Sequence, residues 1–298
     1  MSLADLKRRI NTVKNTGKIT KAMSLISAAQ LSKAKNFLAS YTYYVNLMSD
    51  IMCNISYGAR KRFDTELIIP NDLVVQASQK FLDIHEDYHE PKKRKLLIVI
   101  SASKGLCGAF NSAIVNKTIS ELTKNTDVFC IGKKGYELLS KNKKRHVNIL
   151  YNKYVDINFK KLKTNILMNT ATKKILKLIA CNTYESIDII YTQFVSMLSQ
   201  EVVLEKIFPI HYSNTDEIAF DRNPTHMLID IIPHYLNSLL YNCILSSVKS
   251  ESAKRMITMD NASKNSTDMT DSLTLKYNKA RKEKVTKELI EIISGTTA

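Results

Sequence analysis

Tryptophan is absent from the 298-residue sequence, and proline and glycine occur only five and seven times. No apolar run approaches the roughly eighteen residues that a membrane-spanning helix requires, and the first residues lack the apolar core of a secretory signal peptide. The five cysteines form no CxxC pair, which predicts reduced thiols in a reducing compartment. These absences argue against a membrane-spanning protein and against a disulfide-stabilised secreted domain.

Proline and glycine are scarcest at the two ends of the chain. Residues 1–57 contain no proline and one glycine, and residues 236–293 contain neither. In both segments apolar residues recur at steps of three and four, the period of one helix face. They include Leu3, Leu6, Ile10, Val13, Ile19, Met23 and Ile26 in the first, which continues to Ile55, and Leu236, Leu240, Ile244, Val248, Ala253 and Ile257 in the second, which continues to Ile293. Because helices this long need a partner of similar length, we predict that the two ends pair antiparallel along most of these segments.

Between the two long helices the pattern changes to short apolar runs, glycine turns and shorter helical stretches. Buried strands are predicted at residues 95–101, 127–131 and 186–192, and an antiparallel edge strand at 200–209. Helices are predicted at about 71–87, 111–123, 133–142 and 168–182. The succession of strand, glycine turn, helix and strand is a βαβ unit with a parallel sheet.

The predicted fold class is therefore α/β, with a long antiparallel coiled coil of the N- and C-terminal helices. Residues 1–58 and 224–298 would form the coiled-coil shaft. Residues 59–223 would form an inserted Rossmann-like α/β domain.

The net charge of +16 is unevenly distributed along the chain. Residues 1–40 carry eight lysines and arginines against one acid, whereas the chain from Lys249 onward carries ten basic and seven acidic residues. Such a basic surface could meet phosphates, anionic lipid head groups or acidic protein loops. A coding bias towards lysine, asparagine and isoleucine would also add lysines that have no function. Charge alone leaves a basic coiled-coil protein that binds nucleic acid as an alternative.

Three short patterns could carry chemistry. His85 and His89 match the HExxH zinc pattern, but their segment is short and polar and is closed by Pro91. Ser101 and Lys104 match SxxK, without the other motifs of that enzyme class. Gly105 and Gly108 follow a predicted strand, but neither the GxGxxG nor the P-loop pattern is present, so they predict a tight turn where Cβ atoms would clash. We therefore expect no catalytic residue, no metal ion and no cofactor.

Longer motifs at both ends resemble one family, the γ subunit of F-type ATP synthases. Residues 9–23 (RINTVKNTGKITKAM) are similar to the N-terminal signature of that family, and residues 105–108 (GLCG) to its glycine turn. Residues 250–259 and the stretch from Tyr277 to Gly295 (YNKARKEKVTKELIEIISG) are similar to its C-terminal signatures. The resemblance extends over the whole chain.

This resemblance implies a function that the residue pattern alone does not supply. The coiled coil would be a central shaft that turns inside a hexamer of three α and three β subunits. The α/β domain would be a foot that contacts the ε subunit and the c-ring of the membrane sector. ATP chemistry would take place on β, so this chain would not be an enzyme by itself. It would lie peripherally on the cytoplasmic side of a bacterial inner membrane or, alternatively, on the matrix side of the mitochondrial inner membrane.

The resemblance also assigns roles to individual residues of the shaft. Lys18, Lys21 and Met23 would lie near acidic lever loops of the β subunits. The other expected contacts with the hexamer are Arg255, Thr286 and Glu288, together with Leu289, Ile292 and Ile293 in an apolar sleeve.

Overall fold

The computed structural model describes residues 2–59, 68–83, 94–141, 148–149, 166–181, 184–211 and 223–296. The helices are α1 (Leu3–Ala59), α2 (Asn71–Leu82), α3 (Phe110–Glu121), α4 (Lys133–Lys141), α6 (Ile166–Ala180) and α7 (Pro224–Thr296). The strands are β1 (Lys95–Ile100), β2 (Thr126–Ile131), β3 (Asn148–Ile149), β4 (Ser186–Phe194) and β5 (Gln200–Phe208). None of the described helices combines the length and apolar character that crossing a membrane requires.

The chain forms two compact units, and both long helices contribute to each of them. Unit 1 consists of Met1–Ala29 and Arg255–Ala298, and unit 2 of Gln30–Lys254. The sequence pattern predicted a boundary between shaft and foot at residues 58/59 and 223/224. That division by function stays a prediction.

Unit 2 is built around a five-stranded sheet with the strand order β3-β2-β1-β4-β5. β1 runs parallel to both of its neighbours, with Leu97 level with Val128 on β2 and with Asp188 on β4. β5 runs antiparallel to β4 and is the last strand in the order of the described sheet, which confirms the predicted edge strand. The short strand β3 lies in a stretch for which the sequence pattern predicted no element.

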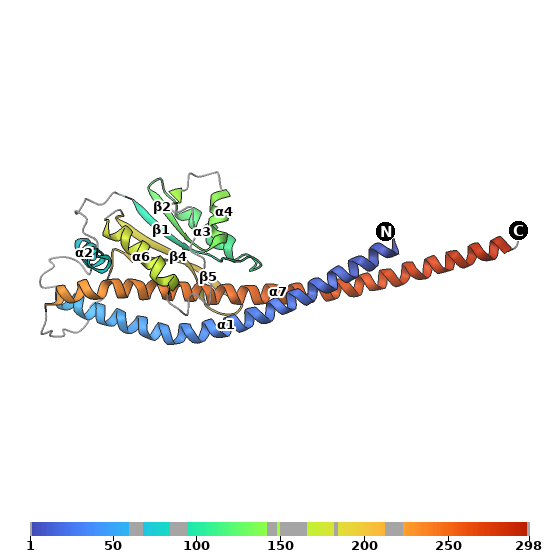
Figure 1. The fold of residues 1–298 in the computed structure, drawn as a ribbon, viewed down its shortest axis with the longest axis horizontal. Helices are drawn as coiled ribbons and strands as arrows, with labels where there is room; N and C mark the ends of the chain where they lie inside the picture. The colour runs from blue at the N-terminus through green and yellow to red at the C-terminus, as the bar shows by residue number, and fades with distance from the viewer. Residues whose placement is uncertain are drawn as a thin grey trace. The chain divides into compact units, whose positions relative to one another are not determined.

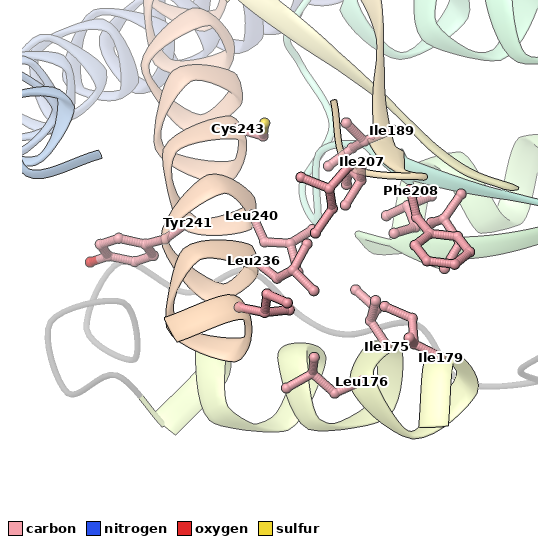
Figure 2. Close-up of a cluster of buried hydrophobic side chains, with 14 of the residues drawn as sticks. Ile175, Leu176, Ile179, Ile189, Ile207, Phe208, Leu236, Leu240, Tyr241 and Cys243 are labelled. Carbon is pink, nitrogen blue, oxygen red and sulfur yellow. The ribbon is translucent and has the colours of Figure 1, made fainter. Parts of the chain in front are cut away.

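Helices cover both faces of this sheet, which explains why its central strands read as continuous apolar runs (Figure 1). Leu96, Ile98 and Ile100 of β1 point into a core shared with α2, α6, α7 and the end of α1. The alternate residues Leu97 and Val99 point into a second core under α3 and α4. Figure 2 shows the first core, where α6 and α7 present apolar side chains to Ile189, Ile207 and Phe208 of the sheet. The side chains labelled there from α6 are Ile175, Leu176 and Ile179, and those from α7 are Leu236, Leu240, Tyr241 and Cys243.

α1 and α7 run antiparallel within each unit. In unit 2 the Tyr41 and Tyr241 rings meet edge to face with centroids 4.4 Å apart, and the Thr42 hydroxyl contacts the Asn242 side-chain oxygen at 3.3 Å. In unit 1 the Ser24 hydroxyl donates a hydrogen bond to the Met256 carbonyl oxygen, and Gly17 faces Ser266. Residue numbers rise along one helix as they fall along the other, which confirms the predicted antiparallel pairing.

The pairing is shorter than predicted, and part of its contact face differs. Every residue from 281 to 293 is exposed, because the facing helix begins at Leu3, opposite the preceding turns of α7. Ile19 and Ile26 were expected in the paired stripe, but they are 61% and 58% exposed. Ser24 and Ser27 are buried there instead. The apolar stripe of the sequence therefore points outward over this stretch of unit 1.

Candidate functional site

The contact face of α1 follows a regular heptad spacing, and its residues are polar or glycine over about three turns of unit 1. Leu3, Leu6, Ile10 and Val13 begin it, and Gly17, Thr20, Ser24 and Ser27 continue it at the same steps of three and four. On α7 the facing positions are Ser263, Ser266 and Thr270. The Ser263 hydroxyl donates a hydrogen bond to the Gly17 carbonyl oxygen at 3.4 Å. A Cβ added to Gly17 would lie 3.0 Å from the Ser266 Cβ, so the two helices approach closely at this point.

A basic groove lies beside this polar contact. It has a volume of about 330 Å³, and Lys14, Gly17, Lys18 and Lys21 line it from α1. Its wall on α7 consists of Ser263, Ser266, Thr267, Thr270 and Asp271. The three lysines follow one another at i, i+4 and i+7, and therefore lie on one side of the helix. The groove can accept an anionic group between ammonium groups and hydroxyl groups.

The two lysines that the resemblance predicted, Lys18 and Lys21, are held differently. Lys21 is paired with Asp260 of α7, with 3.3 Å between Nζ and Oδ1. Lys18 is exposed and forms no ion pair with any residue in the described ranges. The sequence prediction did not include Lys14 or Asp260. Lys14 could have been found from its spacing to Lys18 and Lys21, whereas Asp260 meets Lys21 only through the register of the two helices.

The other residues that the resemblance assigned to the hexamer contact all belong to unit 1. Met23 is half-buried, and Arg255 is 7% exposed. Thr286 is exposed, and Glu288 is exposed while pairing with Lys284 on its own helix at 3.4 Å. These roles stay proposals.

The end of α7 exposes a row of large apolar side chains. Leu289 is 54% exposed and Ile292 is 63% exposed; Val285, Ile290 and Ile293 are exposed to a similar degree. Isolated apolar side chains on a surface are ordinary, but several gathered on one segment indicate a surface that a partner covers.

The predicted glycine turn lies at the carboxyl end of β1. Leu106 and Gly108 have left-handed backbone angles, with φ of 63° and 57°. Gly105 is different, because a Cβ added there would come no closer than 3.9 Å to another residue, an ordinary contact. The reason given for Gly105, a clash of its Cβ, was therefore wrong. The positions where an added Cβ would clash are instead Gly132, which follows β2, and Gly135 in α4. At both of them the Cβ would meet Ser101.

Side chains close the same turn internally. Asn111 accepts a hydrogen bond from the Ala102 amide through Oδ1 at 3.0 Å and donates one to the Cys107 sulfur through Nδ2 at 3.2 Å. Cys107 is 1% exposed. The thiol thus belongs to the packing of the turn.

Metal binding has no support within the described part of the chain, where no group of three or more histidine, cysteine, aspartate or glutamate side chains could hold an ion. His85 and His89, the HExxH pair, lie outside the described residues.

Comparisons with known proteins give a consistent result over the full length. A family model described as ATP synthase matches residues 2–298. The ATP synthase gamma chain of Mycoplasma mobile is 33% identical, over 99% of this chain and 98% of its own length. The gamma chain of Rickettsia bellii is 32% identical, over 100% of this chain and 99% of its own length.

Solved structures with a similar fold belong to the same kind of assembly. A chain of the Euglena gracilis mitochondrial ATP synthase rotor, in rotational state 1, aligns with a TM-score of 0.58 at 15% identity, covering 95% of this chain and 98% of its own. A chain from the OSCP/F1/c-ring structure of that enzyme, in rotational state 3, aligns with a TM-score of 0.62 at 16% identity. The alignment covers 99% of this chain and 94% of the other. At this identity the two structures support the fold, while the sequence matches over the whole length establish the family. The chain therefore belongs to the ATP synthase gamma-chain family.

Proposed function

We propose that this chain is the central rotor shaft of an ATP synthase, coupling proton flow through the membrane rotor ring to ATP synthesis or hydrolysis on the β subunits. The observation that carries the proposal is the outward surface of unit 1. Ile19 and Ile26 are exposed although serines occupy the helix contact beside them, and the last turns of α7 expose a row of apolar side chains. Two helices that pair through serines while exposing isoleucines are suited to a surrounding partner.

The proposed partners are an α3β3 hexamer around unit 1, and the ε subunit and the c-ring at the α/β domain. The proposed contacts with the hexamer are Lys18, Lys21, Met23, Arg255, Thr286, Glu288, Leu289 and Ile292. Lysines on the shaft would meet acidic loops, and each orientation of an asymmetric shaft would favour a different conformation of each β subunit. The chain itself would be non-catalytic and would need no cofactor. It would associate peripherally with a bacterial inner membrane on the cytoplasmic side, or with a mitochondrial inner membrane on the matrix side.

Co-purification tests this proposal directly. A tagged chain expressed in its own cell should bring down α and β subunits, three of each per chain. A matched variant in which Leu289, Ile292 and Ile293 are replaced by aspartate should bring down less of both, because three charges would enter an apolar sleeve. Recovery of the tagged chain without either subunit would contradict the proposal.

The nucleic-acid alternative makes a different prediction in the same preparation. Binding driven by lysine–phosphate contacts weakens steeply as salt rises, so nucleic acid bound to the chain should be lost between low and high salt. The shaft proposal predicts that α and β remain bound through that change, because apolar contacts are insensitive to screening. The alternative also gives no reason for the apolar end of α7.

A further inference from the structure

Asp260 of α7 binds two lysines of unit 1 at once. Its Oδ1 lies 3.3 Å from Nζ of Lys21 on α1, and its Oδ2 lies 3.1 Å from Nζ of Lys264, one turn further along α7. These two ammonium groups, Lys264 first and then Lys21, lower the pKa of the Asp260 carboxyl below its usual value. The carboxylate is therefore charged at neutral pH, and it ties α1 to α7 beside the basic groove.

The three lysines of the groove are not equivalent. Lys14, Lys18 and Lys21 line the groove from the same side of α1. Only Lys21 has an ion-pair partner among the residues that the structure describes. Lys14 and Lys18 face hydroxyl groups of α7, with Asp271 as the acidic side chain in the wall. A carboxylate that enters the groove competes with Asp260 at Lys21, whereas at Lys14 and Lys18 it meets no ion pair among the described residues.

We propose that Asp260 is a positioning residue that holds Lys21 against α7, leaving Lys14 and Lys18 as the cations that the groove offers to an acidic partner. This inference rests on the proposed function, in which the basic face of unit 1 meets acidic loops of the hexamer. It changes the pair of lysines expected from the resemblance, Lys18 and Lys21, to Lys14 and Lys18. An exposed ion pair contributes little to the free energy of folding. The main effect of Asp260 is therefore to decide which lysine ammonium groups an acidic partner can bind.

Chemical labelling tests the positioning directly in the full-length chain. Reductive methylation followed by mass spectrometry reports how fast each lysine reacts. Asp260→Asn should raise the rate at Lys21 by about twofold to fivefold, the range that one exposed ion pair supplies, and leave the rate at Lys18 unchanged. Asp260→Glu should restore the slow rate. Lys264→Gln is the matched control, because it removes the other lysine paired with Asp260. Lys21 stays paired with Asp260 in this variant and should keep its slow labelling rate.

Turnover of the assembled complex tests the consequence for the partner. Freed Lys21 adds a third cation facing the acidic loops, so Asp260→Asn should slow ATP hydrolysis by about twofold to fivefold at low salt. The difference should vanish at roughly 0.3 M salt, where screening acts over a few ångströms. Lys21→Gln should reverse the slowing in the Asp260→Asn background, and its effect on turnover should be smaller in the background that keeps Asp260. Lys18→Gln should have the same effect in both backgrounds.

The outcomes separate this inference from the proposed function. The inference is overturned if Lys21→Gln changes turnover equally with and without Asp260. It is also overturned if Asp260→Asn changes neither the labelling rate of Lys21 nor the salt dependence of ATP hydrolysis. A merely structural Asp260 would lower the thermal midpoint without changing how turnover depends on salt, and that result also overturns it. If the chain assembles with no α and β subunits, the proposed function fails, while the labelling rates still decide whether Asp260 holds Lys21.

Discussion

Gly132 has a tightly constrained backbone position in unit 2. It ends the turn after β2 with a φ of 101°, and a Cβ added there would lie 2.0 Å from the Ser101 carbonyl oxygen. The atom it meets is backbone of the neighbouring strand end, which cannot move without disturbing the sheet. Its position therefore requires glycine for two independent reasons, the left-handed angle and the contact.

Replacing Gly132 should be far more harmful than replacing a glycine with free space. We expect Gly132→Ala to lower the free energy of unfolding by about 3 kcal/mol or more, through backbone strain and the clash. Gly105→Ala is the matched control and should change it by no more than about 0.5 kcal/mol. Urea denaturation of both variants, followed by circular dichroism, measures the difference. Similar midpoints for the two variants would contradict the geometry described for Gly132.

Cys130 gives a prediction in the alkaline range. Burial raises the pKa of its thiol from an ordinary value of 9.0 to about 12. Below pH 9 the thiol is protonated in the folded and the unfolded chain, but between pH 9 and about 12 only the unfolded chain releases the proton. Stability should therefore fall as pH rises through this window, and Cys130→Ala should make the fall shallower.

Thiol labelling at pH 8 checks the same burial independently. Cys130 should react only as fast as the protein unfolds, while the half-buried Cys53 and Cys181 react first. Rapid modification of Cys130 in the native chain would show that the thiol is accessible.

The polar helix contact of unit 1 offers a test at the scale of whole elements. In a disulfide the two Cβ atoms lie about 3.5–4.5 Å apart, and a Cβ at Gly17 would lie 3.0 Å from that of Ser266. A small separation of the helices brings this pair into range. The double variant Gly17→Cys with Ser266→Cys should therefore form an intrachain disulfide on mild oxidation.

A second pair provides the control for this cross-link. Asn15 lies on the same helix but is exposed, so Asn15→Cys with Ser266→Cys should remain reduced under the same conditions. Non-reducing gels and peptide mapping distinguish the species. Exclusive formation of cross-linked dimers by the first pair would contradict antiparallel pairing within one chain.

Helices and strands could be predicted from the sequence wherever a single cause, such as burial on both faces of the sheet or the absence of proline, determined the local pattern. The apolar runs of β1, β2 and β4 predicted buried strands because helices cover both faces of the sheet. The long proline-free ends predicted two paired helices. β3, by contrast, has two residues, too few for any period to be visible.

The candidate site was less predictable. Periodicity identifies the apolar face of a helix, but it does not tell whether another helix of the same chain covers that face. Ile19 and Ile26 fit a helix stripe and were expected to face α7, yet they are exposed, and Ser24 and Ser27 take the contact. Motif resemblance led to Lys18 and Lys21, since it compares local sequence. Asp260 lies 239 positions from Lys21 along the chain, so only the register of the two helices reveals their pairing.

At the scale of the whole molecule, the proposed function requires movement of this chain relative to the hexamer. The chain would carry no catalytic group, so stopping its motion should stop turnover although every catalytic residue of the β subunits is intact. We would introduce Ala22→Cys, an exposed position beside Met23, and a second cysteine in the facing acidic loop of β, after replacing the five native cysteines. Oxidation should abolish steady-state ATP hydrolysis, and a reductant should restore it.

Binding of nucleotide at a single catalytic site should survive the cross-link, because local binding does not need the shaft to turn. A complex with Ala22→Cys but no cysteine in β should keep its activity through oxidation, which separates the bond from side effects of the oxidant. A static scaffold predicts unchanged turnover once the bond has formed. A nucleic-acid-binding protein predicts that no such bond forms, because α and β would not be present. Full turnover with the cross-link complete on a gel would therefore rule out rotation of this chain, since a covalently fixed shaft cannot present its faces to three β subunits in succession.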